Sequence, residues 1–142
     1  MAYFRDLGTS TQIAEGAFVR AVGWLAKGHD FPTGPVPEEF RERLKAFSLG
    51  WGQSVEALGW PVAAGPHACE FCSASHASGN FGVPAGALLY VCPEMLGHYV
   101  DSHRYRPPDA FVSAVLASPV PGTAEYAEAV RPFRPRDWRR DR

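Results

Sequence analysis

The most regular hydrophobic pattern in the chain lies in EEFRERLKAFSLG, residues 38–50. Three large apolar side chains recur there at helical spacing, with charged residues on the other side: Phe40, Leu44 and Phe47. This pattern predicts an amphipathic helix that packs one face on a core and ends near Gly50. The preceding loop GHDFPTGPVP, residues 28–37, is dense in glycine and proline, which interrupt regular structure.

The segment from Thr11 to Lys27 is ambiguous between helix and strand. Its apolar residues fit an i, i+3/i+4 pattern: Ile13, Ala14, Ala17, Phe18, Ala21, Val22 and Leu25. Against a helix, Gly16 and Gly23 lie inside the segment, and FVRAVGWL, residues 18–25, also suits a half-buried strand. The pattern alone leaves both structures open.

The middle of the chain predicts a β-hairpin. FGVP, residues 81–84, and ALLYVC, residues 87–92, are two short strand-like runs separated by Ala85-Gly86. PEMLGHYVDSH, residues 93–103, then fits a helix in which Pro93 takes the first position.

Further helices are predicted near the C-terminus. The helix at 93–103 must end before Pro107-Pro108, because the residue before a proline avoids the helical region. Residues 109–118 and 123–130 fit two shorter helices. These elements predict an α+β fold with one domain over residues 1–130, followed by a basic tail.

Composition narrows the class of protein. With 142 residues, 46% of them hydrophobic and 13% aromatic, the chain can bury one ordinary core. No run of about 18 apolar residues exists, so no transmembrane helix is expected. The N-terminal sequence lacks the basic start and apolar stretch of a signal peptide. The chain has three cysteines, and an odd number argues against a disulfide framework. We therefore expect a cytoplasmic protein with reduced thiols.

Charge is divided unevenly along the chain. Residues 1–130 carry 8 basic and 13 acidic side chains, a net charge of −5, whereas residues 131–142 carry six arginines and two aspartates, a net charge of +4. Such a tail can meet nucleic acid, an acidic partner or the acidic body of its own domain. We favour the last, with Trp138 or Phe133 packed on the domain, because no basic domain surrounds the arginines.

Two cysteines at metal-ligand spacing are the strongest chemical signal. Cys69 and Cys72 form a C-x-x-C turn, and His98 and His103 follow after 25 intervening residues, which completes the pattern C-x2-C-x25-H-x4-H. Zinc prefers four sulfur or nitrogen donors in a tetrahedron, and a C-x-x-C turn supplies two of them. The elements follow in the order of a cysteine turn, a hairpin and a helix that carries the remaining ligands. This order resembles a treble-clef arrangement around one Zn²⁺ per chain.

One geometric objection applies to the histidines. Five residues on an ideal helix separate two side chains by about 140°, so His98 and His103 reach one ion only if the helix loosens near its end. A site made of Cys69, Cys72 and His98 with a water molecule is therefore the alternative.

Other polar residues near the motif have simpler interpretations. A C-x-x-C can also be a redox pair, but no βαβ pattern precedes this one. His67 and His76 are interpreted as loop residues rather than ligands. Cys92 ends an apolar run and is interpreted as a core residue.

Four stretches together resemble a family of small uncharacterised bacterial proteins: AVGWL, GHDFPTG, CEFC and YVCPEMLGHYVDSHRYRPPDAF, over roughly residues 17–115. That family has a C-x-x-C followed by a strand and an H-Y-[IV]-x-x-H-x-Y-x-P-P-x-x-F segment. The resemblance implies that Cys69, Cys72, His98 and His103 are the metal positions. It also implies that four further residues frame the site: Tyr99, Tyr105, Pro107 and Pro108. It brings no established activity.

Two classes of function follow from this pattern. A structural zinc would make the protein a small interaction or regulatory module, with a protein partner and oligomeric state left open. A catalytic zinc would make it a hydrolase in which Glu94, four residues before His98, acts as general base. We favour the structural zinc and a non-enzymatic role. Nucleic-acid binding through the arginine-rich tail is the weakest of the three hypotheses.

Overall fold

The protein is an α+β structure built around a small three-stranded sheet. The computed structural model describes residues 3–61, 67–72 and 74–135. The sheet has the order β1-β5-β4, from β1 (Val19–Ala21), β4 (Asn80–Ala85) and β5 (Leu88–Pro93). Strand β1 runs parallel to β5, and β4 pairs antiparallel with β5, with Gly82 opposite Val91.

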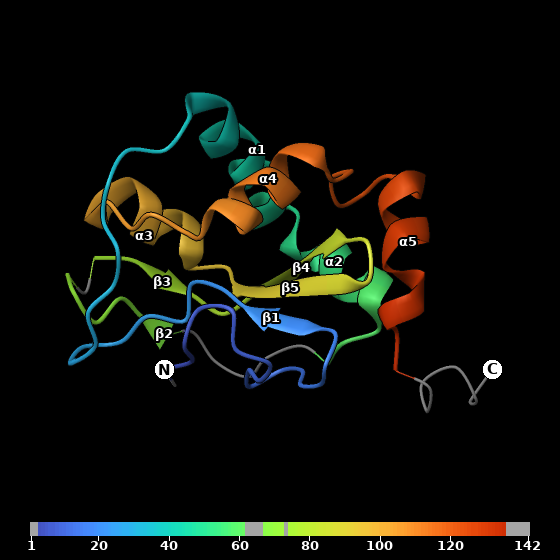
Figure 1. The fold of residues 1–142 in the computed structure, drawn as a ribbon, viewed down its shortest axis with the longest axis horizontal. Coiled ribbons are helices and arrows are strands. Elements are labelled where there is room, and N and C mark those ends of the chain that lie inside the picture. The colour runs from blue at the N-terminus through green and yellow to red at the C-terminus, as the bar shows by residue number, and fades with distance from the viewer. Residues whose placement is uncertain (1–2, 62–66, 73, 136–142) are drawn as a thin grey trace.

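Helices cover one face and one end of this sheet (Figure 1). α1 (Glu38–Leu49), α3 (Leu96–His103) and α4 (Asp109–Ala117) lie above it, α2 (Trp51–Leu58) packs along β4, and α5 (Ala124–Val130) lies toward the end where β4 and β5 join. A short 3-10 helix, η1 (Arg131–Phe133), follows α5. The predicted helices at 38–50, 109–118 and 123–130 are confirmed; α2 was not predicted.

The ambiguous N-terminal segment contains a strand and no helix. Val19 to Ala21 form β1, and Ala21, Val22, Trp24, Leu25 and Ala26 are all buried. The backbone at Gly23 is not helical, because its φ of +87° lies in the left-handed region, which glycine adopts readily. A Cβ atom there would also lie 2.5 Å from Leu96 Cδ1. The chain therefore crosses the core here in an extended path that requires glycine.

The hairpin is confirmed, with the first strand longer than predicted and the second shifted by one residue. Ala85 still pairs with Leu88, so the turn consists of Gly86 and Ala87 rather than Ala85 and Gly86. The predicted start of the next helix at Pro93 is wrong. Pro93 pairs with Asn80 as the last residue of β5, and the helix begins at Leu96.

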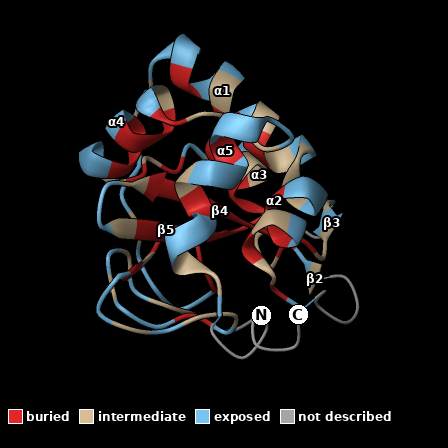
Figure 2. Cartoon of the chain, turned by 90° about the vertical axis from the view of Figure 1, so that its right-hand side faces the viewer, coloured by how far each residue is buried: buried red, intermediate tan, exposed pale blue. Residues whose placement is uncertain are grey.

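The core is one continuous cluster that includes residues from every helix except η1. Red inner faces and pale blue outer faces in Figure 2 show that the helices bury one side each. A closed ring of buried hydrogen bonds joins three elements inside it. The Tyr126 hydroxyl donates to the Gly82 carbonyl, the Gly82 N–H donates to Ser54 Oγ, and Ser54 Oγ lies 2.6 Å from the Tyr126 oxygen. This ring ties α5 and α2 to β4.

The start of the basic tail packs on the domain. The Phe133 ring stacks on Phe18, with centroids 5.7 Å apart, and Arg131 forms a 2.8 Å ion pair with Glu128. This confirms the predicted packing of Phe133, whereas Trp138 lies outside the described residues. Among those residues, no helix is long and apolar enough to cross a membrane.

Candidate metal centre

The cysteine turn is held between two very short strands. β2 (His67–Ala68) and β3 (His76–Ala77) pair antiparallel, with His67 opposite Ala77. The Cys69 N–H donates to the Ser75 carbonyl at 2.9 Å, which closes the turn. The Ala74 N–H donates to Cys72 Sγ at 3.4 Å.

Both histidines come from α3, and the end of this helix resolves the objection about their spacing. The N–H groups of Arg104 and Tyr105 both donate to the Tyr99 carbonyl, five and six residues back, instead of continuing the i→i−4 pattern. Arg104 has a left-handed φ of +57° and ends the helix. The last turn is therefore wide, and the His98 and His103 rings lie 5.1 Å apart.

The four predicted residues converge on one point. Their ligand atoms all lie within 4.8 Å of one another. Cys69 Sγ is 3.4 Å from His103 Nε2, and Cys72 Sγ is 3.3 Å from His98 Nε2. Cys69 is buried, the histidines are half-buried and Cys72 is exposed, so the cluster opens at the surface beside Cys72.

These distances fit a tetrahedral metal ion. Sulfur and nitrogen ligands at about 2.3 and 2.1 Å from one ion would lie about 3.6 Å apart at the tetrahedral angle. The two observed sulfur–nitrogen distances are close to this value, so small adjustments would place the ion. Two thiolates and two imidazoles are also the donor types that zinc favours. The residues present can hold a metal ion.

Electrostatics favour the ligand form of His98. Its pKa is lowered first by burial and next by the neighbouring His103, and the opposing effect of Asp101 is smaller. A lowered pKa keeps the imidazole neutral, and a metal binds only neutral imidazole. The ring is therefore prepared for coordination at neutral pH.

Tyr99 lies against the site, as the family resemblance implies. Its ring centroid is 6.2 Å from that of His98 and 6.4 Å from that of His103. The buried hydroxyl has no hydrogen-bond partner among the described residues. Burial, followed by the negative charges of Cys69 and Glu70, raises the Tyr99 pKa. The phenol therefore stays protonated beside the sulfur atoms.

Two residues within the cysteine turn make contacts that the sequence did not predict. The Phe71 ring contacts Tyr99 and His103, with centroids 5.9 and 5.4 Å apart, and so packs the turn onto α3. Glu70 accepts a 2.9 Å hydrogen bond from the Lys27 N–H, which lowers the Glu70 pKa. In the sequence, Phe71 could have been noticed as an aromatic residue inside the C-x-x-C motif. No local sequence feature indicates that Glu70 accepts a hydrogen bond from Lys27.

Glu94 lies beside the centre but binds backbone. Its Oε1 accepts the Gly79 N–H at 3.0 Å, and its own N–H donates to the Gly79 carbonyl at 2.8 Å. This pair fixes the connection between β3 and β4. Glu94 and His98 also share the lining of a surface hollow of about 200 Å³.

The remaining candidates lie away from the ligand atoms. His67 and His76 belong to β2 and β3 and are not members of the four-residue cluster. Cys92 is fully buried in the core, where desolvation raises its thiol pKa well above the usual range. Pro107 and Pro108 line a cavity that none of the four cluster residues lines.

The fold and the clustered donors describe an α+β domain with a candidate Cys2His2 metal centre. The chain belongs to a family defined by a domain of unknown function, DUF7919, whose family model matches residues 2–116. This match agrees with the resemblance to an uncharacterised family, and it includes all four cluster residues. Comparison with curated proteins and with solved structures finds no match.

Proposed function

We propose that Cys69, Cys72, His98 and His103 bind one zinc ion that has a structural role. The convergence of two sulfur and two nitrogen donors within 4.8 Å supports this proposal, because four protein ligands complete a tetrahedral shell. A zinc ion held in this way would leave no ligand position for a substrate or a nucleophilic water. The three-ligand alternative keeps Cys69, Cys72 and His98 and replaces His103 by water.

The position of the cluster explains why a metal would be needed. Strands β2 and β3 have two residues each, too few to be stable by themselves. A metal bound to both cysteines and to both histidines would fasten this turn to α3. The resulting arrangement of cysteine turn, hairpin and helix is treble-clef-like. We infer that the domain acts as a small interaction or regulatory module, with the metal maintaining its surface.

Hydrolysis is the second candidate, because Glu94 and His98 line the same hollow. In that case Glu94 would act as general base on a zinc-bound water. Its carboxylate already accepts the Gly79 N–H, which is a structural role that needs no substrate. The structural zinc is therefore the proposal we favour.

Metal analysis and cobalt substitution test this proposal. Protein purified without chelator should contain about one zinc per chain. After exchange, Co²⁺ should give the intense visible bands of a four-coordinate site, and adding azide or another small anion should leave them unchanged. Bands that shift with anion would show an open position and support the hydrolase. Absence of metal, with Cys69 and Cys72 both freely titratable, would reject the site.

A further inference from the structure

The metal centre does not use two of the most distinctive stretches of the sequence, GHDFPTG (28–34) and RYRPPD (104–109). The structure places them side by side. Thr33 and Tyr105 form an isolated antiparallel bridge. The Gly34 N–H donates to the Arg104 carbonyl and the Arg106 N–H donates to the Pro32 carbonyl, each at 3.0 Å. Two loops from distant parts of the chain are thus fixed to each other.

These loops form two walls of a cavity of about 490 Å³, and the N-terminal segment forms the third. The volume lies in the range of small-molecule sites. Much of the wall is apolar and rigid, contributed by two phenylalanines, one leucine and three prolines, with the Tyr3 ring beside them: Phe4, Leu25, Phe31, Pro32, Pro107 and Pro108. Aromatic rings and prolines lose little conformational entropy when a ligand binds, because they have few rotatable bonds.

Asp6 supplies a carboxylate to this wall. Its Oδ2 accepts the Tyr105 hydroxyl at 2.7 Å, and its Oδ1 accepts the Gly23 N–H at 3.1 Å. A carboxylate has about four acceptor positions, so two remain for a ligand. Burial raises the Asp6 pKa, and the two hydrogen bonds only partly oppose it. Within the described part of the chain, no cation forms an ion pair with this carboxylate.

The other charged groups of the cavity lie toward solvent. Arg106 is paired with Asp109 at 2.8 Å, and the Asp109 side chain is 86% exposed. Arg5 and Asp30 are both exposed, so water screens their charges. The carboxylate of Asp6 is therefore the least solvated charge in the cavity. A cationic ligand would gain more by pairing with Asp6 than with the exposed charges at the rim.

We propose that this cavity binds a small organic cation, an ammonium or guanidinium group carried on an apolar or aromatic body. The cation would donate hydrogen bonds to the free positions of Asp6, and charge-assisted bonds of this kind are stronger than neutral ones. The body would pack on Phe4, Phe31 and the prolines, where the ring faces also attract a cation. This site is new and independent of the proposed zinc.

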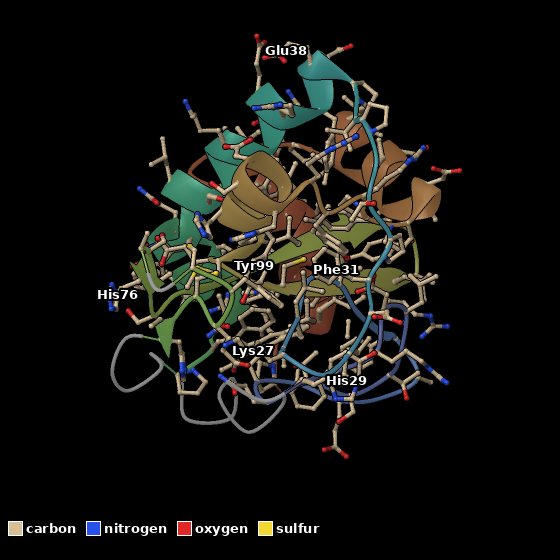
Figure 3. All side chains as sticks on the ribbon, turned by 90° about the vertical axis from the view of Figure 1, so that its left-hand side faces the viewer. Lys27, His29, Phe31, Glu38, His76 and Tyr99 are labelled. Atoms are coloured by element: carbon tan, nitrogen blue, oxygen red, sulfur yellow. The ribbon has the colours of Figure 1, made fainter. Side chains whose placement is uncertain are left out.

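The cavity is separated from the metal centre by aromatic side chains. The Phe31 ring contacts Phe71 of the cysteine turn at 5.5 Å and Tyr105 at 5.9 Å between centroids. In Figure 3, Phe31 and Tyr99 both lie in the interior of this face, whereas His29 and His76 lie at its outer edge. A ligand against Phe31 would therefore be one aromatic ring away from the turn that carries the cysteines.

Calorimetric titration of the full chain, tagged at the C-terminus only, tests the proposal with two matched probes. Phenethylamine is cationic at neutral pH, and 2-phenylethanol has a similar shape without charge. We expect the amine to bind with a dissociation constant of about 1 mM or tighter, which is ordinary for so small a ligand. The alcohol should bind at least about tenfold more weakly. Equal affinities, or no binding of the amine, would overturn the proposal.

Variants locate the cation. Asp6→Asn should weaken amine binding at least about tenfold, whereas Asp30→Asn, at the exposed rim, should change it less than about threefold. The reverse order would contradict the assignment. If Asp6→Asn fails to fold, NMR of the wild-type protein decides the question. The amine should shift the ring protons of Phe4 and Phe31 and leave those of Phe133 unchanged, and any other distribution of shifts would reject the site.

Discussion

Cys69 Sγ lies 3.4 Å from Nε2 of His103, although 34 residues separate them in sequence. Cys72 and His98 form the complementary pair at 3.3 Å, so the first cysteine meets the second histidine and the second meets the first. This arrangement fastens the cysteine turn to both ends of α3. A metal bound to all four would cross-link the turn and α3, in addition to the packing of Phe71 on that helix.

Loss of a ligand should therefore remove both metal and stability. We expect Cys69→Ala, Cys72→Ala, His98→Ala and His103→Ala each to lose bound zinc and to lower the free energy of unfolding, since metal binding is coupled to folding. Elemental analysis and urea unfolding measure the two effects.

Cys92→Ala is the matched control for these variants. Cys92 is buried in the core and is not in the ligand cluster, so the variant should keep its metal and lose about 1 kcal/mol of stability. Loss of zinc in Cys92→Ala, together with its retention in His103→Ala, would show that the ligand assignment is wrong.

Glu94 should behave as a structural acceptor. Glu94→Gln retains an oxygen that accepts the Gly79 N–H, so its free energy of unfolding should lie within about 0.5 kcal/mol of the wild-type value. Glu94→Ala leaves that N–H without its partner and should cost about 1 to 2 kcal/mol. Both variants should keep their metal by elemental analysis. A zinc content that falls in both would instead place Glu94 among the ligands.

The buried ring of hydrogen bonds at Tyr126 should contribute strongly to stability. Tyr126→Phe removes the hydroxyl that donates to Gly82 and lies beside Ser54, and the cost should be about 1 to 3 kcal/mol in chemical unfolding. Tyr3→Phe, at the stacked pair with His29, is the matched control and should change stability by less than about 0.5 kcal/mol. Similar effects of the two substitutions would refute the importance of the ring.

A related expectation concerns the C-terminal boundary of the domain. Residues 117–130 lie beyond the family match but include α5, whose Tyr126 and Val130 are fully buried. A chain ending at residue 116 should therefore fail to unfold cooperatively, whereas one ending at residue 135 should do so.

Removing the tail should affect stability more than nucleic-acid binding. Deletion of residues 131–142 removes Phe133, which stacks on Phe18. We expect the free energy of unfolding to fall by about 1 to 2 kcal/mol and the zinc content to stay unchanged. If the tail instead binds duplex DNA, six arginines limit the log–log salt slope to about −5, at roughly −0.9 per phosphate. Fluorescence anisotropy that shows salt-sensitive, sub-micromolar binding by the full chain alone would overturn our preference.

Much of the fold was predictable where the pattern is local. Phe40, Leu44 and Phe47 mark the buried face of α1, and all three are buried. α2 was missed although WGQSVEAL places Trp51, Val55 and Leu58 at helical spacing, because Gly50 and Gly52 interrupt the pattern at its start. Its stability comes from packing on β4 and α5, which a short pattern does not contain.

The sequence by itself determined which residues are available for metal chemistry. The spacing of two cysteines and two histidines limits the ligand set, because thiolates and imidazoles are the donors zinc selects. Tertiary structure decided whether they meet. The wide last turn of α3 brings His98 and His103 together, and this turn depends on hydrogen bonds to the Tyr99 carbonyl that a regular helix would not make.

The cavity beside Asp6 was determined entirely by tertiary structure. Its walls come from the N-terminal segment, residues 25–32 and residues 106–109, which are far apart in sequence. Local patterns report which face of an element is apolar, because neighbouring side chains set that face. They do not report which elements touch, because that depends on the packing of the whole core. For the same reason, the sequence did not show the steric limit at position 23. That limit comes from Leu96, which packs against Gly23 in the folded core.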